Sequence, residues 1–474
     1  MNPSRDQPAA PPRLASSPAP MARRTWRRRR GLVAAVLAVP ALAAALLAAQ
    51  ADMITLGAEA YLYGYPLLIV DASRDRITAL AAPANVLHRM RQFPDAGFKE
   101  VVRPNVDTLY TSAFIDTARG PCLFEMPANA ERYEVMPFMD AWTNVFATLG
   151  TRTEGTGGGR YWLVGPGVAP PPDDGLPVMR SPTRWAWLIG RTQTNGSGDY
   201  ETVHRLQDGL RLRCDGAQRG AAAPEEPWPA GPATPREAVD SLATREFFRR
   251  LAALMLDNPP AAADAPLLRR LEGTGFKPGH APDWGLLDLW SLSLGRAIAD
   301  HRVAQALAST QGLRNGWSTP PQAIGDYGTD YPTRAAVAMV GLGANLPQDA
   351  VYMSARLDAQ GQALQGSRRY RLHFAPQELP PVKAFWSITA YGADEFLIAN
   401  PQQRYALGDR DPLVRNADGS LDLWVQAEQP AAERRPNWLP VQAGQPFQLV
   451  ARLYWPRHTA LSGAWQMPAL ERLD

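Results

Sequence analysis

The 474-residue sequence has few of the residues that usually indicate a redox, metal or nucleotide site. It contains 2 Cys and 6 His, and no pair of His has the spacing of metal ligands on one element. A P-loop, a G-x-G-x-x-G after a strand, an H-E-x-x-H and a G-x-S-x-G elbow are all missing. These absences argue against the best-known phosphate, dinucleotide, zinc-protease and serine-hydrolase sites, and we expect no metal and no cofactor.

Excess positive charge is also missing from most of the chain. Residues 1–51 hold eight Arg against one Asp, a net charge of +7, so the rest of the chain carries −4 of the total of +3. No nucleic-acid partner is therefore expected. Pro (45) and Gly (38) are too frequent for a helical bundle, whereas 14 Trp and 14 Tyr favour pleated sheets.

The N-terminal tail has the pattern of an export signal. RRTWRRRR at 23–30 precedes an uncharged run, GLVAAVLAVPALAAALLAA, at 31–49, and AQA at 49–51 is a small-x-small cleavage site. Cleavage would release a periplasmic or secreted protein that begins at Asp52, and the paired arginines also allow a twin-arginine route. The alternative is an uncleaved anchor in the inner membrane, since the run is about long enough to span. Both interpretations leave the rest of the chain outside the cytoplasm.

The body of the chain alternates between helix-like and strand-like segments. Residues 52–80 have apolar positions at helical spacing, and Pro66 predicts a bend that divides the helix into two pieces. From 101 to about 191, runs such as LYTSAFID and RYEVMPFMD recur between Gly, Pro and Asn clusters, as in an antiparallel sandwich or barrel. Helical spacing returns after Pro235 and strands return after Trp317. The two strand-rich regions have a similar texture, but no residue-level repeat is apparent.

These transitions predict the domain organisation. The expected segments are 1–51 (signal peptide or membrane anchor), 52–100 (N-terminal helical region), 101–214 (first β-sandwich), 215–235 (Pro/Ala-rich connector), 236–316 (helical bridge) and 317–474 (C-terminal β-sandwich). Within the first sandwich, the glycine-rich GTGGGR at 155–160 predicts a hairpin turn. Cys122 and Cys214 leave two alternatives, a disulfide formed outside the cytoplasm or two buried, unpaired thiols.

The most polar segment of the first β region is RPNVDTLYTSAFID at 103–116. Asn105, Asp107, Thr108 and Tyr110 lie where a strand begins, and loops at the ends of a sandwich often bind ligands. An Asx-type turn that merely caps the backbone is the alternative.

A second polar cluster follows at 139–157. Its Asp140, Asn144 and Arg152 are candidates for the same site. If Asp140 lies beside Asp107, like-charge repulsion would raise the pKa of one carboxyl and supply an acid/base pair.

A third segment, 384–410, carries Trp386, Tyr391 and Arg404, which together predict a pocket for a planar or anionic ligand. Packing at a sheet edge and turn capping explain these residues equally well. His88 lies in a less regular stretch before the first sandwich and is the histidine that we consider a candidate base.

Four long motifs connect the sequence with a known family. PNVDTLYTSAFID, FMDAWTNVFATLGTRTEGTGGGRYWLVGPG, GDYGTDYPTRAAVAMVGLGAN and AFWSITAYGADEFLIANPQQRYALGDR resemble a large bacterial family that joins two domains of unknown function, twelve-fifty-four followed by twelve-fourteen. The resemblance implies two jelly-roll-like β domains held by helices in a protein that is often exported or lipid-anchored. It implies no agreed reaction and assigns no role to any residue.

The predicted fold is therefore α+β, with two antiparallel jelly-roll-like β domains joined by a helical segment and an N-terminal helix after a signal peptide. We predict an exported, cofactor-independent hydrolase or lyase with its site near the first β domain; the alternative is a non-catalytic envelope module that binds a glycan or another small ligand. A membrane contact is expected only through the N-terminal segment. The predicted catalytic residues are His88, Asp107, Tyr110 and Asp140, and the predicted substrate-binding residues are Asn105, Thr108, Asn144, Arg152, Trp386, Tyr391 and Arg404.

Overall fold

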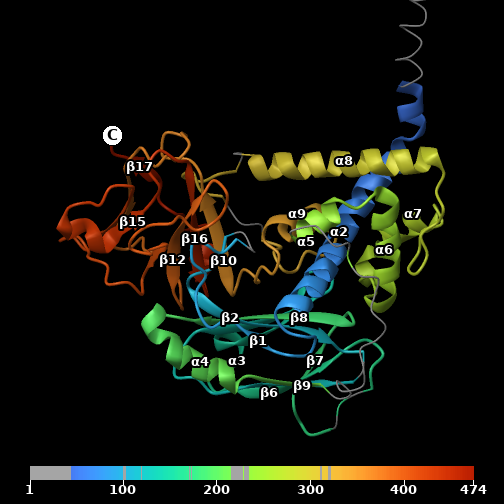
Figure 1. The fold of residues 1–474 in the computed structure, drawn as a ribbon, viewed down its shortest axis with the longest axis horizontal. Coiled ribbons are helices and arrows are strands. Elements are labelled where there is room, and N and C mark those ends of the chain that lie inside the picture. The colour runs from blue at the N-terminus through green and yellow to red at the C-terminus, as the bar shows by residue number, and fades with distance from the viewer. Residues whose placement is uncertain are drawn as a thin grey trace, which may run out of the picture.

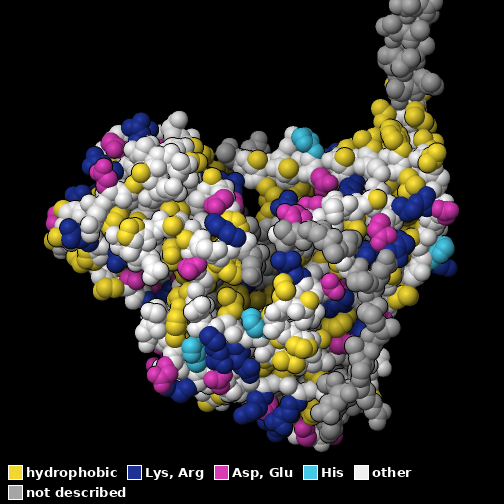
Figure 2. Space-filling view, viewed as in Figure 1, with side chains coloured by type: hydrophobic (Ala, Val, Ile, Leu, Met, Phe, Trp, Pro, Cys, Tyr) yellow, Lys and Arg dark blue, Asp and Glu magenta, His cyan; other side chains and the backbone are white. Residues whose placement is uncertain are grey.

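The described part of the chain forms a helical layer and two β-sandwiches (Figure 1). The computed structural model describes residues 44–99, 103–118, 120–169, 171, 173–214, 228, 234–309, 312–318 and 322–474. Most of the predicted tail at 1–51 and of the predicted connector at 215–235 lies outside the described residues. Figure 2 shows that the surface is hollowed where the C-terminal sandwich meets the rest of the molecule.

The N-terminal sandwich consists of two facing sheets. One has the strand order β1-β2-β8-β4-β5 and the other β7-β6-β3-β9. Apolar side chains of both sheets, including Ile115, Phe124, Phe138 and Leu163, fill the space between them. The strands are β1 (His88–Arg89), β2 (Thr108–Asp116), β3 (Cys122–Met126), β4 (Glu134–Asp140), β5 (Val145–Gly150), β6 (Gly159–Val164), β7 (Val178–Arg180), β8 (Trp185–Gln193) and β9 (Arg211–Cys214).

The C-terminal sandwich has the same construction. Its sheets have the orders β10-β16-β12-β13 and β15-β14-β11-β17, and Leu372, Ile388, Leu423 and Leu449 meet in the core between them. The strand-like runs of the sequence are strands in both sandwiches. The bounds are β10 (Ala350–Ala355), β11 (Tyr370–Phe374), β12 (Trp386–Gly392), β13 (Ala406–Gly408), β14 (Leu421–Gln426), β15 (Trp438–Pro440), β16 (Phe447–Tyr454) and β17 (Leu470–Arg472).

The helical layer is organised around α2 (Ala51–Leu80). Its C-terminal half also covers the five-stranded sheet, where Val70 packs with Phe114, Trp187 and Ile189. By length and composition α2 is apolar enough to cross a membrane, but 67% of its most apolar window is buried in the fold. The other helices of the layer are α5 (Pro235–Asp240), α6 (Thr244–Asp257), α7 (Ala265–Glu272), α8 (Leu286–Ala308) and α9 (Tyr331–Val340).

The prediction that Pro66 divides this helix into two pieces is wrong, because α2 is unbroken from Ala51 to Leu80. Proline removes one backbone donor and usually ends or kinks a helix. Here α2 is buried from Tyr63 to Arg74, and packing on several sides stabilises the helix against this loss.

Three further expectations need correction. The segment after Trp317 was predicted to be strand, but it contains α9, which begins with Pro332 in its first turn and the Asp330 side chain as its cap. The first strand of that sandwich therefore starts only at Ala350. The glycine-rich 155–160 is not a hairpin, since β5 and β6 lie in different sheets. Finally, the sheets are not wholly antiparallel, because β6–β7 and β14–β15 pair in parallel.

The two sandwiches share one topology. β2, β8, β4 and β5 pair as β10, β16, β12 and β13 do, and β7, β6, β3 and β9 pair as β15, β14, β11 and β17 do. Corresponding strands also follow one another in the same order along the chain, and the parallel contact falls at the same place in both. The molecule therefore contains an internal duplication that we did not find in the sequence.

The duplication also extends to residues. DTLYTSAFID at 107–116 and DAVYMSARLD at 349–358 share the pattern D-x-x-Y-x-S-A-x-x-D across β2 and β10. The tyrosine of each motif pairs with an arginine of the neighbouring strand, so that Tyr110 lies opposite Arg191 and Tyr352 lies opposite Arg452.

A second repeated motif ends β5 and β13, LGTR at 149–152 and LGDR at 407–410. A Cβ on either glycine would lie 2.2 Å from a carbonyl oxygen, that of Glu134 in the first sandwich and of Trp386 in the second, so only glycine fits. The third residue of each motif accepts the backbone N–H of that same neighbour, over 2.8 Å in the first sandwich and 3.1 Å in the second.

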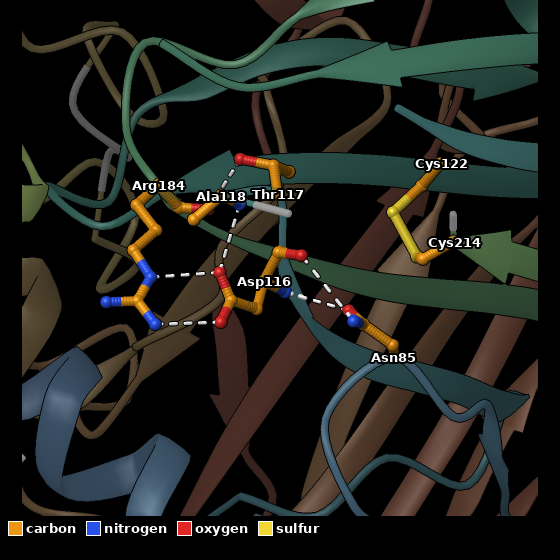
Figure 3. Close-up of a disulfide and its surroundings, with 7 residues drawn as sticks. All are labelled: Asn85, Asp116, Thr117, Ala118, Cys122, Arg184 and Cys214. Atoms are coloured by element: carbon orange, nitrogen blue, oxygen red, sulfur yellow. Dashed lines mark hydrogen bonds and ion pairs between the residues drawn. A yellow bond between two sulfur atoms is a disulfide. The ribbon is translucent and has the colours of Figure 1, made fainter. Parts of the chain in front are cut away.

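A disulfide joins Cys122 on β3 to Cys214 on β9, which resolves the alternative left open by the sequence (Figure 3). The two cysteines lie opposite each other in the antiparallel pair. Near this bond, the Arg184 guanidinium donates to both oxygens of Asp116, at 2.9 and 2.8 Å, and connects the end of β2 to the start of β8.

Candidate functional site

Two ion pairs connect the sandwiches to each other. Arg410, which follows β13, pairs with Asp107 before β2. Arg152, which follows β5, pairs with Asp349 before β10, with N–O distances of 2.5 and 3.1 Å. These are the equivalent residues of the two repeats, so each sandwich supplies the arginine for the aspartate of the other.

Asp107 is fully committed to this interface. Its second oxygen accepts a hydrogen bond from the Ser387 hydroxyl at 2.6 Å, and the side chain is 1% exposed. A carboxylate with both oxygens occupied is poorly placed to take a proton from a substrate.

The paired Arg and Tyr of the first repeat begin a polar network. The Nε of Arg191 donates to the Tyr110 hydroxyl at 3.2 Å, and its two terminal nitrogens donate to the Asn345 side-chain oxygen and, at 2.8 Å, to the Gly343 carbonyl. The amide of Asn345 donates in turn to the Tyr352 hydroxyl at 2.7 Å. Both tyrosines of the repeated motif therefore belong to one network.

Asn105 extends this network into the C-terminal sandwich. Its amide nitrogen lies 2.7 Å from the Tyr454 hydroxyl, 3.1 Å from the Thr108 hydroxyl and 3.4 Å from the Tyr110 hydroxyl. Its oxygen accepts the backbone N–H of Asp107 at 2.6 Å, which is the Asx-type turn that the sequence offered as an alternative. Asn105 thus both caps the turn and connects two tyrosines.

Arg452 is the residue of the second sandwich that corresponds to Arg191 of the first. It donates to the Thr389 hydroxyl at 2.7 Å, to the Tyr391 hydroxyl at 2.5 Å and to the Arg103 carbonyl at 3.2 Å. The hydroxyl of Tyr391 donates to the Pro104 carbonyl at 2.7 Å. This predicted site residue therefore holds Arg452 rather than lining a separate pocket.

The network is rich in donors, and the carboxylate whose charge acts on Arg452, that of Asp107, is already paired with Arg410. Arg191 and Arg452 are 6% and 3% exposed, and within the described residues their acceptors are neutral oxygens. Within the described residues, three tyrosine hydroxyl groups accept a hydrogen bond without donating one to a protein acceptor, namely those of Tyr110, Tyr352 and Tyr454. Buried cations and hydroxyl groups of this kind are suited to a bound anion.

The tyrosines differ in acidity. Burial opposes the ionisation of Tyr110, but the charge and hydrogen bond of Arg191 and the hydrogen bond of Asn105 outweigh it, so its pKa lies below the ordinary value. Burial raises the pKa of Tyr352 and of Tyr454. Environments that separate the pKa values of neighbouring groups are typical of acid/base sites.

The network is accessible at its tyrosines. Tyr110 and Tyr352 are only half-buried, whereas Arg191, Arg452 and Tyr454 are buried. A separate, mainly apolar cavity between α2, α6 and the first sheet is lined by Leu67, Phe114 and Leu254 among others. The one guanidinium among the described residues that line it, that of Arg74, is paired with Asp71, and these residues contain no hydroxyl group, so we place the candidate site at the tyrosines.

Two predicted site residues, Asp140 and Asn144, belong to a turn outside the network. Asp140 accepts hydrogen bonds from the backbone N–H groups of Trp142 and Asn144, at 2.9 and 2.8 Å, and from the Asn144 amide. Burial raises the pKa of Asp140 to about 6. Asp140 and Asn144 therefore cap the β4–β5 turn, while the partners of Asp107 are Arg410 and Ser387.

Three other predicted residues also lie apart from the network. Trp386 is buried in the C-terminal core against Phe374. Arg404 donates to the Arg435 and Trp438 carbonyls, and His88 pairs with Ser112 on an edge strand. Within the described residues, no three His, Cys, Asp or Glu side chains are grouped as a metal site requires. The structure thus unites Asn105, Asp107, Thr108, Tyr110, Arg152 and Tyr391 at the interface between the sandwiches.

Sequence reasoning missed five members of the network, namely Arg191, Asn345, Tyr352, Arg452 and Tyr454. Asn345 follows a Gly-rich segment, and Arg452 and Tyr454 lie in a mostly apolar strand, where a single polar residue has no obvious role. The repeated D-x-x-Y-x-S-A-x-x-D pattern was the available signal, because it aligns Tyr352 with Tyr110.

Two family models match the chain, one over the N-terminal sandwich and the other over β10 to β16 of the C-terminal sandwich. The first, described as Protein of unknown function (DUF1254), matches residues 84–214, and the second, Protein of unknown function (DUF1214), matches residues 349–458. No curated protein matches the chain.

Two solved structures are similar over most of the chain. The crystal structure of the VPA0106 protein from Vibrio parahaemolyticus is 23% identical, with a TM-score of 0.66 over 89% of this chain and 100% of that one. An uncharacterised protein from Burkholderia cenocepacia is 12% identical, with a TM-score of 0.46 over 91% and 98%. The first likeness supports the mixed α+β fold, and neither title assigns a function.

Proposed function

The chain belongs to the bacterial family that joins these two domains of unknown function, and because that family carries no reaction, we propose a function from the site itself. We propose that the protein is an exported, cofactor-independent lyase that acts on a small carboxylate-bearing compound between the two sandwiches. The observation that supports this is the set of buried arginines and acceptor-free tyrosine hydroxyls around Tyr110. The same proposal includes the jelly-roll description of the sandwiches, a signal peptide or membrane anchor at the N-terminus, and a location outside the cytoplasm.

The proposed chemistry uses Arg191 and Tyr110. Arg191 binds the substrate carboxylate and stabilises the negative charge that develops next to it. Tyr110, as the phenolate that Arg191 and Asn105 favour, takes the proton from the carbon beside the carboxylate. The carbon–carbon double bond forms as the bond to the leaving oxygen breaks, and Tyr110 returns the proton to that oxygen. The enzyme ends in its starting state, so no co-reactant is needed.

The test compares Tyr110 with its duplicate, Tyr352. The full-length protein is assayed against a panel of uronates and hydroxycarboxylates by the absorbance of the unsaturated product. We expect Tyr110→Phe to lower kcat by about 100-fold or more, as loss of an acid/base group does, while Tyr352→Phe stays within about tenfold, as expected of a residue that only contacts the ligand. Equal turnover by the wild type and Tyr110→Phe would eliminate Tyr110 as the base.

Non-catalytic binding of the same anion is the second candidate, and the burial of Arg191, Arg452 and Tyr454 favours it. Calorimetric binding of a panel member without turnover, lost in Arg191→Gln but kept in Tyr110→Phe, would establish this function instead. A glycan-binding aromatic surface receives less support, because Trp386 lies in the core. Thermal melts of all the variants separate loss of function from loss of folding.

A further inference from the structure

A group of exposed large apolar side chains lies at one corner of the helical layer. Leu286 is 90% exposed, Leu287 42% and Trp290 41%, all in the first turns of α8. Leu46 and Leu47, in the helical residues 44–49 just before α2, are 40% and 44% exposed. Figure 2 shows this apolar corner directly below the point where the N-terminal segment leaves the fold. Soluble proteins seldom leave such a group of side chains in water without a partner.

The corner exists because α8 crosses α2 at close range. A Cβ on Gly57 of α2 would lie 2.9 Å from the Leu292 Cα, and one on Gly295 of α8 would lie 2.3 Å from the Ile54 carbonyl. Glycine on both helices therefore brings the two axes together and fixes the start of α8 beside the start of α2. In Figure 1, α8 crosses the N-terminal end of α2, and the first described residues extend past α8.

The outward face of α8 remains poor in charge over its first half. Its inward face buries Leu292, Ala299 and Val303. Trp290 and Ala297 are exposed on the other side, at helical spacing, and the charged Asp300 and Arg302 are exposed only further along the helix.

We propose that this outward face of α8 lies on the surface of a lipid bilayer. The chain itself supports this occupant, because the uncharged run at 31–49 ends at the same corner and its last residues are exposed. A bilayer-anchored run would bring Leu286, Leu287 and Trp290 to the level of the headgroups, where tryptophan is favoured. α8 would then lie parallel to the bilayer plane, with the N-terminal sandwich on the side of the molecule away from the bilayer (Figure 1).

The test uses the full-length chain, with its N-terminal segment, reconstituted into phosphatidylethanolamine/phosphatidylglycerol vesicles. Leu286→Cys, a substitution at a largely exposed position, carries an environment-sensitive fluorophore, and Ser197→Cys before α4 (Tyr200–Gly209) is the matched exposed control. The native cysteines are held in their disulfide. With nitroxide-labelled acyl chains in the vesicles, we expect at least about twofold quenching of the label at 286 and none at 197.

Three outcomes would overturn the proposal. The first is equal quenching at 286 and 197. The second is crosslinking between copies through Leu286→Cys, which would show that a second chain covers the face. The third is purified protein that starts at Asp52 and does not bind the vesicles. As a second measurement, Leu287→Asp should weaken flotation with vesicles, whereas Val414→Asp, at an exposed apolar position of the C-terminal sandwich, should not.

Discussion

The two sandwiches secure the same strand in different ways. In the N-terminal sandwich, a disulfide between Cys122 and Cys214 joins β9 to β3. In the C-terminal sandwich, the equivalent strand β17 is held to β11 by the cross-strand pair of Arg371 and Glu471, with an N–O distance of 2.6 Å. The two outer strands therefore differ in the bond that holds them to the sheet, which is a disulfide for β9 and an ion pair for β17.

The sheet that contains β2 and β8 and the sheet that contains β10 and β16 have diverged much less. Both keep a tyrosine opposite an arginine, at Tyr110 and Arg191 in one sandwich and at Tyr352 and Arg452 in the other. Both also keep the aspartate and arginine that pair across the interface. The residues retained after duplication thus mark the interface, and the candidate site lies among them.

The largest expected effect comes from breaking the reciprocal ion pairs. Arg410→Met should lower the free energy of unfolding by about 3–5 kcal/mol, because it leaves a buried carboxylate without its partner. Arg152→Met should cost a similar amount, since Asp107 and Asp349 are both 1% exposed. Urea denaturation measures both. A loss below about 1 kcal/mol in either variant would contradict their equivalence, and adding Asp107→Asn to Arg410→Met should restore much of the stability.

Removal of the disulfide should have the next largest effect. The Cys122→Ala/Cys214→Ala variant should lose about 2–4 kcal/mol of unfolding free energy, because the bond closes a long loop in the unfolded chain. The sequence separation of the two cysteines is 92. Thermal denaturation with and without reductant measures the effect, and the double variant, which has no disulfide to reduce, should be indifferent to reductant.

The β4–β5 and β12–β13 connections should respond to pH in opposite directions. Burial raises the pKa of Asp140 to about 6, above its unfolded value of about 3.9. The folded state then holds this proton more tightly, so the contribution of Asp140 is present below about pH 4 and is lost as the pH rises to about 6. Asp140→Asn should remove roughly 1–3 kcal/mol of this pH dependence.

Asp394, in the β12–β13 connection, is the matched control. Burial opposes its ionisation, but the Phe396 N–H and Lys99 outweigh this and lower its pKa. Its contribution is therefore present above the unfolded pKa and is lost on acidification. Urea titrations from about pH 2 to pH 7, which span both transitions, compare Asp140→Asn with Asp394→Asn, and the same sign of change in both would refute the assignment.

The smallest effect is expected at the pair that replaces the disulfide in the second sandwich. Arg371→Ala should cost no more than about 1 kcal/mol, because exposed ion pairs contribute little. Its side chain is 34% exposed and that of Glu471 is 47% exposed. Added salt should reduce the difference further, and a cost equal to that of the disulfide would show that β17 needs a strong bond.

The sequence predicted most strands, because their apolar runs and turn residues act locally. It predicted α9 wrongly, since the cap and proline that start this helix lie among glycines that also suit a loop. It missed the site arginines for a different reason. Arg191 follows the apolar first half of β8 and Arg452 lies in the mostly apolar β16. Only the long-range pairing of these strands with β2 and β10 brings the arginines opposite the tyrosines. The sequence also could not show that Asp107 and Asp140 have separate partners, Arg410 and Ser387 for the first and the β4–β5 turn for the second.

The reciprocal ion pairs also determine how early the interface between the sandwiches can form during synthesis of the chain. Asp107 and Arg410 are 303 residues apart, and Arg152 and Asp349 are 197 apart. At a synthesis rate of about 5–20 residues per second, Arg410 emerges roughly 15–60 s after Asp107. During that interval the N-terminal sandwich has a carboxylate that it cannot bury, so its half of the site stays open. The interface can close only after nearly the whole chain has been made.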